Sequence, residues 1–261
     1  MNMFDNHDDA QPPARQSRPG TPSLVVALDV PGATQALALA DQLSGLPLWM
    51  KVGLELFTAE GPSPVRALLQ RGFPVFLDLK YHDIPNTVHG AVHSASVIGA
   101  GMCTLHVAGG EAMCRAAVQG RAQAMLEAAS AGGTPSAPPL LMGVTALTSQ
   151  DGEAEDMETL VVERALAAKA WGLDGVVCSG REAAAVKEAC GESFLCLCPG
   201  IRYSSTGIAD RNDQARISTP REAVAAGADF LVLGRPIIRS ADPAAAAVKA
   251  LEHIQDALHT E

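Results

Sequence analysis

Short apolar runs alternate with longer helix-like stretches along most of the chain. Eight of the runs are five or six residues long and nearly continuous in apolar residues, which is typical of parallel strands covered on both faces. They lie at 24–28, 48–52, 74–79, 102–107, 140–145, 175–179, 194–198 and 230–234. Ala-rich stretches with helical spacing follow them, at 33–44, 62–71, 86–99, 111–130, 155–171, 181–190, 219–227 and 242–258.

This repeat predicts the fold class. Eight strand–helix units within 261 residues indicate an α/β protein built as a closed (β/α)₈ TIM barrel. A doubly wound open sheet is the alternative, although such sheets more often have fewer strands. No linker divides the chain after residue 22, so residues 23–261 are expected to form one domain. Residues 1–22 are polar and rich in Pro and Asp, and we expect a flexible tail there.

Composition narrows the possible partners and location. Hydrophobic residues make up 48% of the chain and aromatics only 4%, so Ala, Val and Leu must fill most of the core. The formal net charge of −10 disfavours a nucleic-acid partner, but still allows a local pocket for a small anion. No apolar run reaches the length of a membrane span, and residues 1–22 lack the apolar segment of a signal peptide. We therefore expect a cytoplasmic protein with no membrane partner.

The six cysteines are expected to be structural. Cys103, Cys178, Cys196 and Cys198 fall in strand-like runs, and Cys114 and Cys190 in helix-like ones. The spacing of Cys196 and Cys198 raises the possibility of a metal site, but no CxxC pair or supporting histidine spacing accompanies it. Buried small side chains in a reducing compartment are the simpler interpretation, and no metal site is predicted.

Polar side chains gather at the C-terminal ends of the predicted strands, where barrel enzymes carry their active sites. They are Asp29, Lys51, Asp78, Lys80, Asp83, His106, Thr145, Thr148, Arg202 and Arg235. Asp78 and Lys80 are two apart on one strand and so face the same way, and Lys51 on the neighbouring strand can join them. These charges could form a purely structural ion-pair network. The high cost of burying so many charges, and their place at the barrel rim, favour a functional site.

A second signal points to phosphate. The stretch "GRPI" at 234–237 follows the last strand, where barrels often bind phosphate. The guanidinium of Arg235 can donate bidentate hydrogen bonds to a phosphate. The connection 199–216 is long for a strand–helix loop, which is typical of a lid. Taken alone, Arg202 is more simply an ordinary solvated arginine. We interpret His106 as a histidine whose hydrogen bonds are satisfied at the barrel mouth.

At residues 78–87 the sequence "DLKYHDIPNT" resembles the signature of the orotidine 5′-phosphate decarboxylase family. Further matches follow in the family's order: "ALD" at 27–29, "KVG" at 51–53, "LHVAGG" at 105–110, "VTALTS" at 144–149, "PGIR" at 199–202, "DQARISTP" at 213–220 and "GRPI" at 234–237. The resemblance implies the barrel fold, a homodimer with a composite active site, and decarboxylation of orotidine 5′-monophosphate to UMP and CO₂. That reaction is the final step of de novo pyrimidine nucleotide synthesis. No cofactor is implied, and the sequence has neither a GxGxxG nor a P-loop pattern.

The resemblance also assigns the catalytic residues. Asp78, Lys80 and Asp83 look like the family's charged cluster, with Lys51 completing it. Lys80 would be the proton donor. Asp83, Ile84 and Thr87 would reach into the site of the partner subunit.

Substrate-binding residues follow from the same resemblance. Asp29 and Lys51 would contact the ribose hydroxyls, and Thr148 would hold the pyrimidine edge. The phosphate would be bound by Arg202, Gln214, Gly234 and Arg235. Gln214 could also reach the base.

Two alternatives remain. A metal-dependent decarboxylase or aldolase of the same barrel type, acting on a ketose phosphate, would share a D-x-K-x-x-D pattern. The stretches "IPNT", "PGIR" and "DQ" favour the nucleotide enzyme. A non-catalytic nucleotide-binding barrel would bind the nucleotide without turnover.

Overall fold

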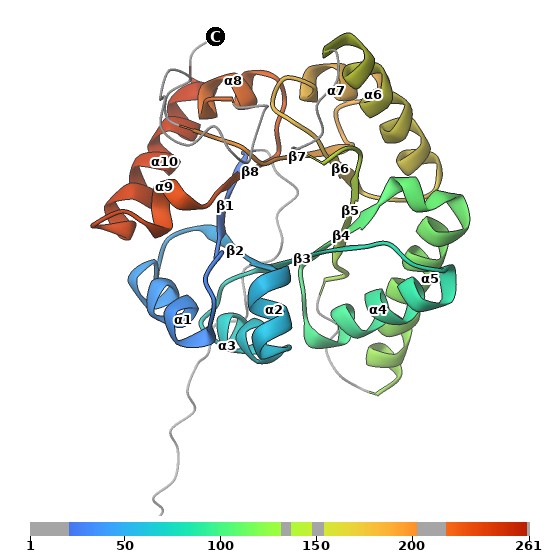
Figure 1. The fold of residues 1–261 in the computed structure, drawn as a ribbon, viewed down its shortest axis with the longest axis horizontal. Coiled ribbons are helices and arrows are strands. Elements are labelled where there is room, and N and C mark those ends of the chain that lie inside the picture. The colour runs from blue at the N-terminus through green and yellow to red at the C-terminus, as the bar shows by residue number, and fades with distance from the viewer. Residues whose placement is uncertain (1–20, 132–136, 148–153, 203–217, 260–261) are drawn as a thin grey trace, which may run out of the picture.

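A closed barrel of parallel strands forms the centre of this computed structural model (Figure 1), which describes residues 21–131, 137–147, 154–202 and 218–259. The strands in these residues are β1 (Ser23–Ala27), β2 (Leu48–Gly53), β3 (Val75–Tyr81), β4 (Met102–His106), β5 (Leu140–Val144), β6 (Gly175–Val177), β7 (Leu195–Cys198) and β8 (Phe230–Leu233). Each strand pairs with the next in sequence order, and β8 closes the barrel against β1, with Val25 opposite Val232. The predicted (β/α)₈ TIM barrel is confirmed.

Helices surround the barrel on the outside (Figure 1). They are α1 (Ala33–Gln42), α2 (Leu54–Glu60), α3 (Ser63–Gln70), α4 (Pro85–Ile98), α5 (Gly110–Ser130), α6 (Ala154–Ala170), α7 (Ala183–Cys190), α8 (Pro220–Ala225), α9 (Arg235–Ile238) and α10 (Pro243–Leu258), with a 3₁₀ turn η1 (Val107–Gly109). The helical spacing did not predict α2, α9 or η1. These elements are three to seven residues long, too short for a 3.6-residue period to show.

Alternation along the strands separates two hydrophobic cores. One set of side chains packs between the strands and the helices. The other set fills the barrel interior: Val25, Ala27, Trp49, Phe76, Met102, Met142, Val144, Val177, Leu197, Phe230 and Val232. Within this interior Trp49 and Phe230 meet edge to face, with ring centroids 5.6 Å apart. The interior core supports the residues at the barrel mouth from below.

The turns that lead into β6 and β8 share one motif. Gly172 and Gly227 end the preceding helices with φ of 90° and 89°, a conformation that glycine adopts without steric cost. The next residue, Leu173 or Ala228, is buried and donates its N–H back to the helix, which closes a Schellman cap. An aspartate follows each cap and stands directly before its strand. The motif therefore fixes Asp174 and Asp229 at the N-terminal end of the barrel.

All six cysteines are buried and free of disulfides, as predicted. None of the helices in the described part of the chain has the length and apolar character needed to cross a membrane. Most of the predicted tail, residues 1–20, lies outside the described residues.

Candidate active site

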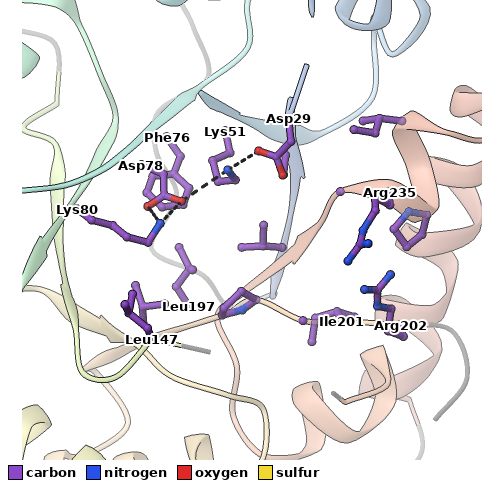
Figure 2. Close-up of a pocket in the computed structure, with 18 of the residues that line it drawn as sticks. Asp29, Lys51, Phe76, Asp78, Lys80, Leu147, Leu197, Ile201, Arg202 and Arg235 are labelled. Carbon is purple, nitrogen blue, oxygen red and sulfur yellow. Dashed lines mark hydrogen bonds and ion pairs between the residues drawn. The ribbon is translucent and has the colours of Figure 1, made fainter. Parts of the chain in front are cut away.

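A pocket of about 500 Å³ opens at the C-terminal ends of the strands (Figure 2). Apolar side chains of the barrel interior line it, among them Ala27, Phe76, Val144, Val177, Leu197 and Val232. Asp29, Lys51, Asp78 and Lys80 lie together in one part of the wall, and Arg202 and Arg235 lie in another (Figure 2). The pocket thus combines an apolar interior with two separate charged regions.

Four of the predicted residues form a continuous row of alternating charge. The Lys51 Nζ lies 2.9 Å from the Asp29 Oδ1 and 3.6 Å from the Asp78 Oδ2. At the end of the row the Lys80 Nζ lies 2.8 and 2.9 Å from the two Asp78 oxygens. Strand pairing places the row, because β2 lies between β1 and β3 and Gly53 is opposite Asp78. The structure therefore brings together residues that are up to 51 positions apart, from Asp29 to Lys80.

The central carboxylate of this row, Asp78, is charged at neutral pH. Burial alone would raise its pKa, and its side chain is only 12% exposed. The Lys51 and Lys80 ammoniums oppose this effect, as do hydrogen bonds from Lys80 and Thr104, and together they hold the pKa of Asp78 below its usual value. The carboxylate therefore stays an anion beside the pocket.

The backbone at Lys80 is unusual. Lys80 has a φ of 49°, the one positive φ at a non-glycine residue in the described chain. Such a conformation costs on the order of 1–3 kcal/mol and persists only where its surroundings hold it. The register between β3 and β4 shifts at the same place, since Leu77 pairs with Cys103 and Tyr81 pairs with Leu105. This bulge re-aims the end of β3, as bulges near active sites commonly do.

The arginine region of the pocket contains the predicted Arg202 and Arg235, on the far side of the pocket from Lys80 in Figure 2. The predicted Gly234 also lines the pocket. Gly234 precedes α9, which begins at Arg235. Arg239 also lines the pocket, although it is not among the predicted site residues. It follows Arg235 by four residues, and that helical spacing was the available signal.

Other predicted residues lie elsewhere. Asp83, Ile84 and Thr87 are exposed and do not line the pocket of their own chain. The Ile84 side chain is 67% exposed, and the Asp83 Oδ1 accepts the backbone N–H of Ile84 at 2.7 Å. Thr148 and Gln214 lie outside the described residues, as does most of the 199–216 loop.

His106 stands at the barrel mouth beside the charged row. Its ring stacks on His82, with centroids 5.1 Å apart and planes 29° apart. Burial lowers the pKa of His106, and the nearby His82, Lys80 and Arg164 lower it further. His106 is therefore neutral at pH 7, as an ordinary structural histidine would be. Among the residues that the structure describes, no three His, Cys, Asp or Glu side chains converge as a metal site would need.

The barrel and the pocket at the C-terminal ends of its strands define a TIM-barrel enzyme. Residues 22–250 match the Orotidine 5'-phosphate decarboxylase / HUMPS family. The chain belongs to this family.

Individual relatives agree with the family match. A protein of Nitratidesulfovibrio vulgaris (strain DP4) named orotidine 5'-phosphate decarboxylase is 56% identical over 229 residues, which cover 86% of this chain and 94% of the relative. One of Maridesulfovibrio salexigens with the same name is 50% identical over 230 residues, covering 86% and 95%. The crystal structure of orotidine 5'-phosphate decarboxylase from Lactobacillus acidophilus superposes with a TM-score of 0.74 at 33% identity, covering 90% of this chain and 99% of that one.

Proposed function

We propose that the chain decarboxylates orotidine 5′-monophosphate to UMP and CO₂, the final step of de novo pyrimidine nucleotide synthesis, with Lys80 as the proton donor. The family and the names of its relatives support the reaction. The observation that carries the role of Lys80 is the row of alternating charge, which ends at the pocket with the Lys80 ammonium.

The reaction requires an acid at one position. When the bond between C6 and the carboxylate breaks, CO₂ leaves and the electron pair stays on C6, in the plane of the pyrimidine ring. The ring π system cannot accept that pair. An ammonium facing C6 stabilises the developing charge and then transfers a proton to C6, which yields UMP and a neutral Lys80 amine. Water returns the proton to Lys80.

Asp78 has two roles in this proposal. Its carboxylate holds the Lys80 ammonium in place through contacts of 2.8 and 2.9 Å. It also lies next to the position proposed for the substrate carboxylate, and the repulsion between the two anions is relieved as CO₂ leaves. Lys51 keeps Asp78 charged from the other side, at 3.6 Å.

The remaining pocket residues bind the substrate. We assign the ribose hydroxyls to Asp29 and Lys51, and the phosphate to Arg202, Gly234 and Arg235. The separation of Arg202 and Arg235 from Lys80 (Figure 2) lets one nucleotide span the pocket with its phosphate far from C6. Thr148 and Gln214 are assigned to the pyrimidine and phosphate by resemblance to the family alone.

Asp83, Ile84 and Thr87 complete the proposal through a homodimer. They are exposed and do not line their own pocket, as expected of residues that enter the site of a second copy. Lys80→Ala and Asp83→Ala proteins, each inactive alone, should regain activity when mixed, because one site of the heterodimer contains neither defect. Exchange of subunits without any recovery would contradict the shared site.

The proposal also covers the cellular location of the enzyme and the boundary of its domain. Six buried free cysteines suit the reducing cytoplasm, where we place the protein. The catalytic domain is residues 23–261, and residues 1–22 are a tail outside it.

A spectroscopic assay tests the function directly. Purified protein should remove the absorbance of orotidine 5′-monophosphate, and EDTA should not slow the reaction. Loss of activity with EDTA would favour the metal-dependent ketose-phosphate enzyme. Tight nucleotide binding without turnover would favour the non-catalytic barrel.

A further inference from the structure

Thr104 stands behind the charged row, on the strand next to the one that carries Lys80. We propose that Thr104 is a positioning residue for the decarboxylation proposed above, and that its hydroxyl fixes the Lys80 backbone and the Asp78 carboxylate relative to each other. The inference rests on that proposed function and adds a residue that neither the sequence motifs nor the pocket lining identifies.

The hydroxyl bonds to both members of the catalytic pair. The Thr104 Oγ1 accepts the backbone N–H of Lys80 at 3.0 Å and donates to the Asp78 Oδ1 at 2.9 Å. Thr104 has no exposed surface, so its hydroxyl has no contact with bulk water. The same Asp78 oxygen receives the Lys80 ammonium at 2.8 Å. One buried atom therefore links the backbone of the proton donor with the carboxylate that holds its side chain.

The direction of these two hydrogen bonds is fixed by the chemistry of their partners. An amide N–H only donates and an ionised carboxylate only accepts, so the hydroxyl must direct its proton to Asp78 and a lone pair to Lys80. Serine can reproduce that arrangement. Valine has the same shape but can make neither bond.

The bulge in β3 explains why the link is needed. The five residues of β3 from Leu77 to Tyr81 lie opposite only three of β4, from Cys103 to Leu105. Thr104 is the β4 residue between the two paired positions, and its side chain supplies the hydrogen bond that Lys80 N–H makes across the bulge. Without that bond the Lys80 N–H would lose its partner and Lys80 would be free to leave its φ of 49°.

Thr145 provides a matched control. It is buried, and its Oγ1 donates to the backbone oxygen of Val177 at 2.8 Å. Its neighbours Val144 and Ala146 line the pocket and Thr145 does not, since its hydroxyl is bonded to the backbone of β6. Thr145→Val removes a buried hydroxyl directly after β5 without touching the charged row.

The test compares wild type, Thr104→Val, Thr104→Ser, Thr104→Ala and Thr145→Val for thermal stability, UMP affinity, and kcat and KM with orotidine 5′-monophosphate. We expect Thr104→Val to lower kcat by about 10- to 100-fold, the scale of loss for a misplaced catalytic group, with KM and UMP affinity nearly unchanged. Thr104→Ser should stay near wild type, and Thr145→Val should lose stability but keep its kcat. If Thr104→Val does not fold, the difference between Ser and Ala at this position tests the same hydroxyl.

A pH profile separates positioning from general stability. The Thr104 bond helps to hold the pKa of Asp78 down. Its loss should therefore move the acid limb of the kcat profile to higher pH, while Thr145→Val leaves that limb in place. A Thr104→Val kcat close to wild type, or a Thr104→Ser loss as large as that of Thr104→Val, overturns the proposal. Wild-type protein that does not turn over the substrate overturns the proposed function, and this inference with it.

Discussion

Both ends of the barrel contain pairs of lysine and aspartate, but the two ends use them differently. At the N-terminal end, before β7 and β8, the Lys187 Nζ contacts the Asp229 Oδ2 at 2.8 Å. At the C-terminal end, the Lys80 Nζ contacts the Asp78 Oδ1 at the same distance. The distance between the charges does not distinguish the pairs. The other groups that each charged side chain binds do distinguish them.

At the N-terminal end every proton of the ammonium has an acceptor. Lys187 donates to Asp229, to the Glu192 backbone oxygen at 2.9 Å and to the Phe194 backbone oxygen at 3.0 Å. An ammonium has three protons, so none remains for a ligand. Asp229 also accepts the Cys196 N–H at 2.7 Å, which ties β7 to the start of β8. Arg121 and Asp174 form a second pair at this end, and Asp174 also accepts the backbone N–H of Leu141 at 2.8 Å.

At the C-terminal end the Lys80 ammonium contacts the two oxygens of one carboxylate, and its side chain is 32% exposed toward the pocket, against 7% for Lys187. At least one of its protons is thus directed away from the protein contacts that hold it. The comparison teaches that saturated donors mark a structural lysine, and that incompletely used donors beside a cavity mark a chemical one.

Lys80→Ala should give the largest effect. We expect kcat to fall by at least about 10⁴-fold, the upper range for a single acid–base group, because no other ammonium lies at that end of the row. Folding should survive, since the side chain is partly exposed. Steady-state kinetics with circular dichroism measure both quantities. A folded variant that turns over at the wild-type rate would remove Lys80 as the proton donor and end the contrast with Lys187.

Lys187→Met should show the opposite pattern. It leaves the buried Asp229 carboxylate without its counter-charge, and breaking such a pair costs about 3–5 kcal/mol of unfolding free energy. The kcat of the folded protein should not change, because Lys187 lies at the far end of the barrel. Urea unfolding and active-site titration measure the two effects. A variant of unchanged stability would show that the N-terminal pair is dispensable.

Arg235→Ala tests the second charged region of the pocket. If Arg235 binds the phosphate, its loss should lower kcat/KM. The corresponding rise in activation free energy should be about 2–5 kcal/mol, the cost of losing a desolvated charged contact. The substrate orotidine, which lacks the phosphate, should already react poorly and should hardly be affected by the substitution. The comparison of two proteins with two substrates isolates the phosphate. Equal losses with both substrates would contradict the assignment.

The barrel and most of its charged row were predictable from sequence, for one physical reason. Strands buried on both faces are continuous apolar runs, and a polar residue at the end of such a run stands out. Asp78 and Lys80 also share a face by simple alternation, and Lys51 lies on the adjacent strand. The sequence therefore predicted which charges stand at the mouth before any contact was known.

What escaped prediction depends on contacts between distant elements. Thr104 looks like any residue of an apolar strand, and only the bulge opposite it gives its hydroxyl two partners. Lys187 and Asp229 are 42 positions apart, in a helix and before a strand. No local pattern links them. The saturation of Lys187, which separates it from Lys80, is a property of the folded chain alone.

His106→Asn should give the smallest effect, and it concerns how much positive charge the C-terminal end tolerates. The folded protein lowers the pKa of His106 from its ordinary value of 6.5, through burial and the neighbouring His82, Lys80 and Arg164, while Asp78 acts in the opposite direction. The unfolded chain therefore binds this proton first as the pH falls. The stabilising contribution is present above about pH 6.5 and is lost below it. Unfolding free energies measured between about pH 5 and 8, the range over which histidine changes charge, should rise with pH more steeply in wild type than in His106→Asn. Equal slopes would mean that the mouth accepts a further cation beside Lys80 without cost.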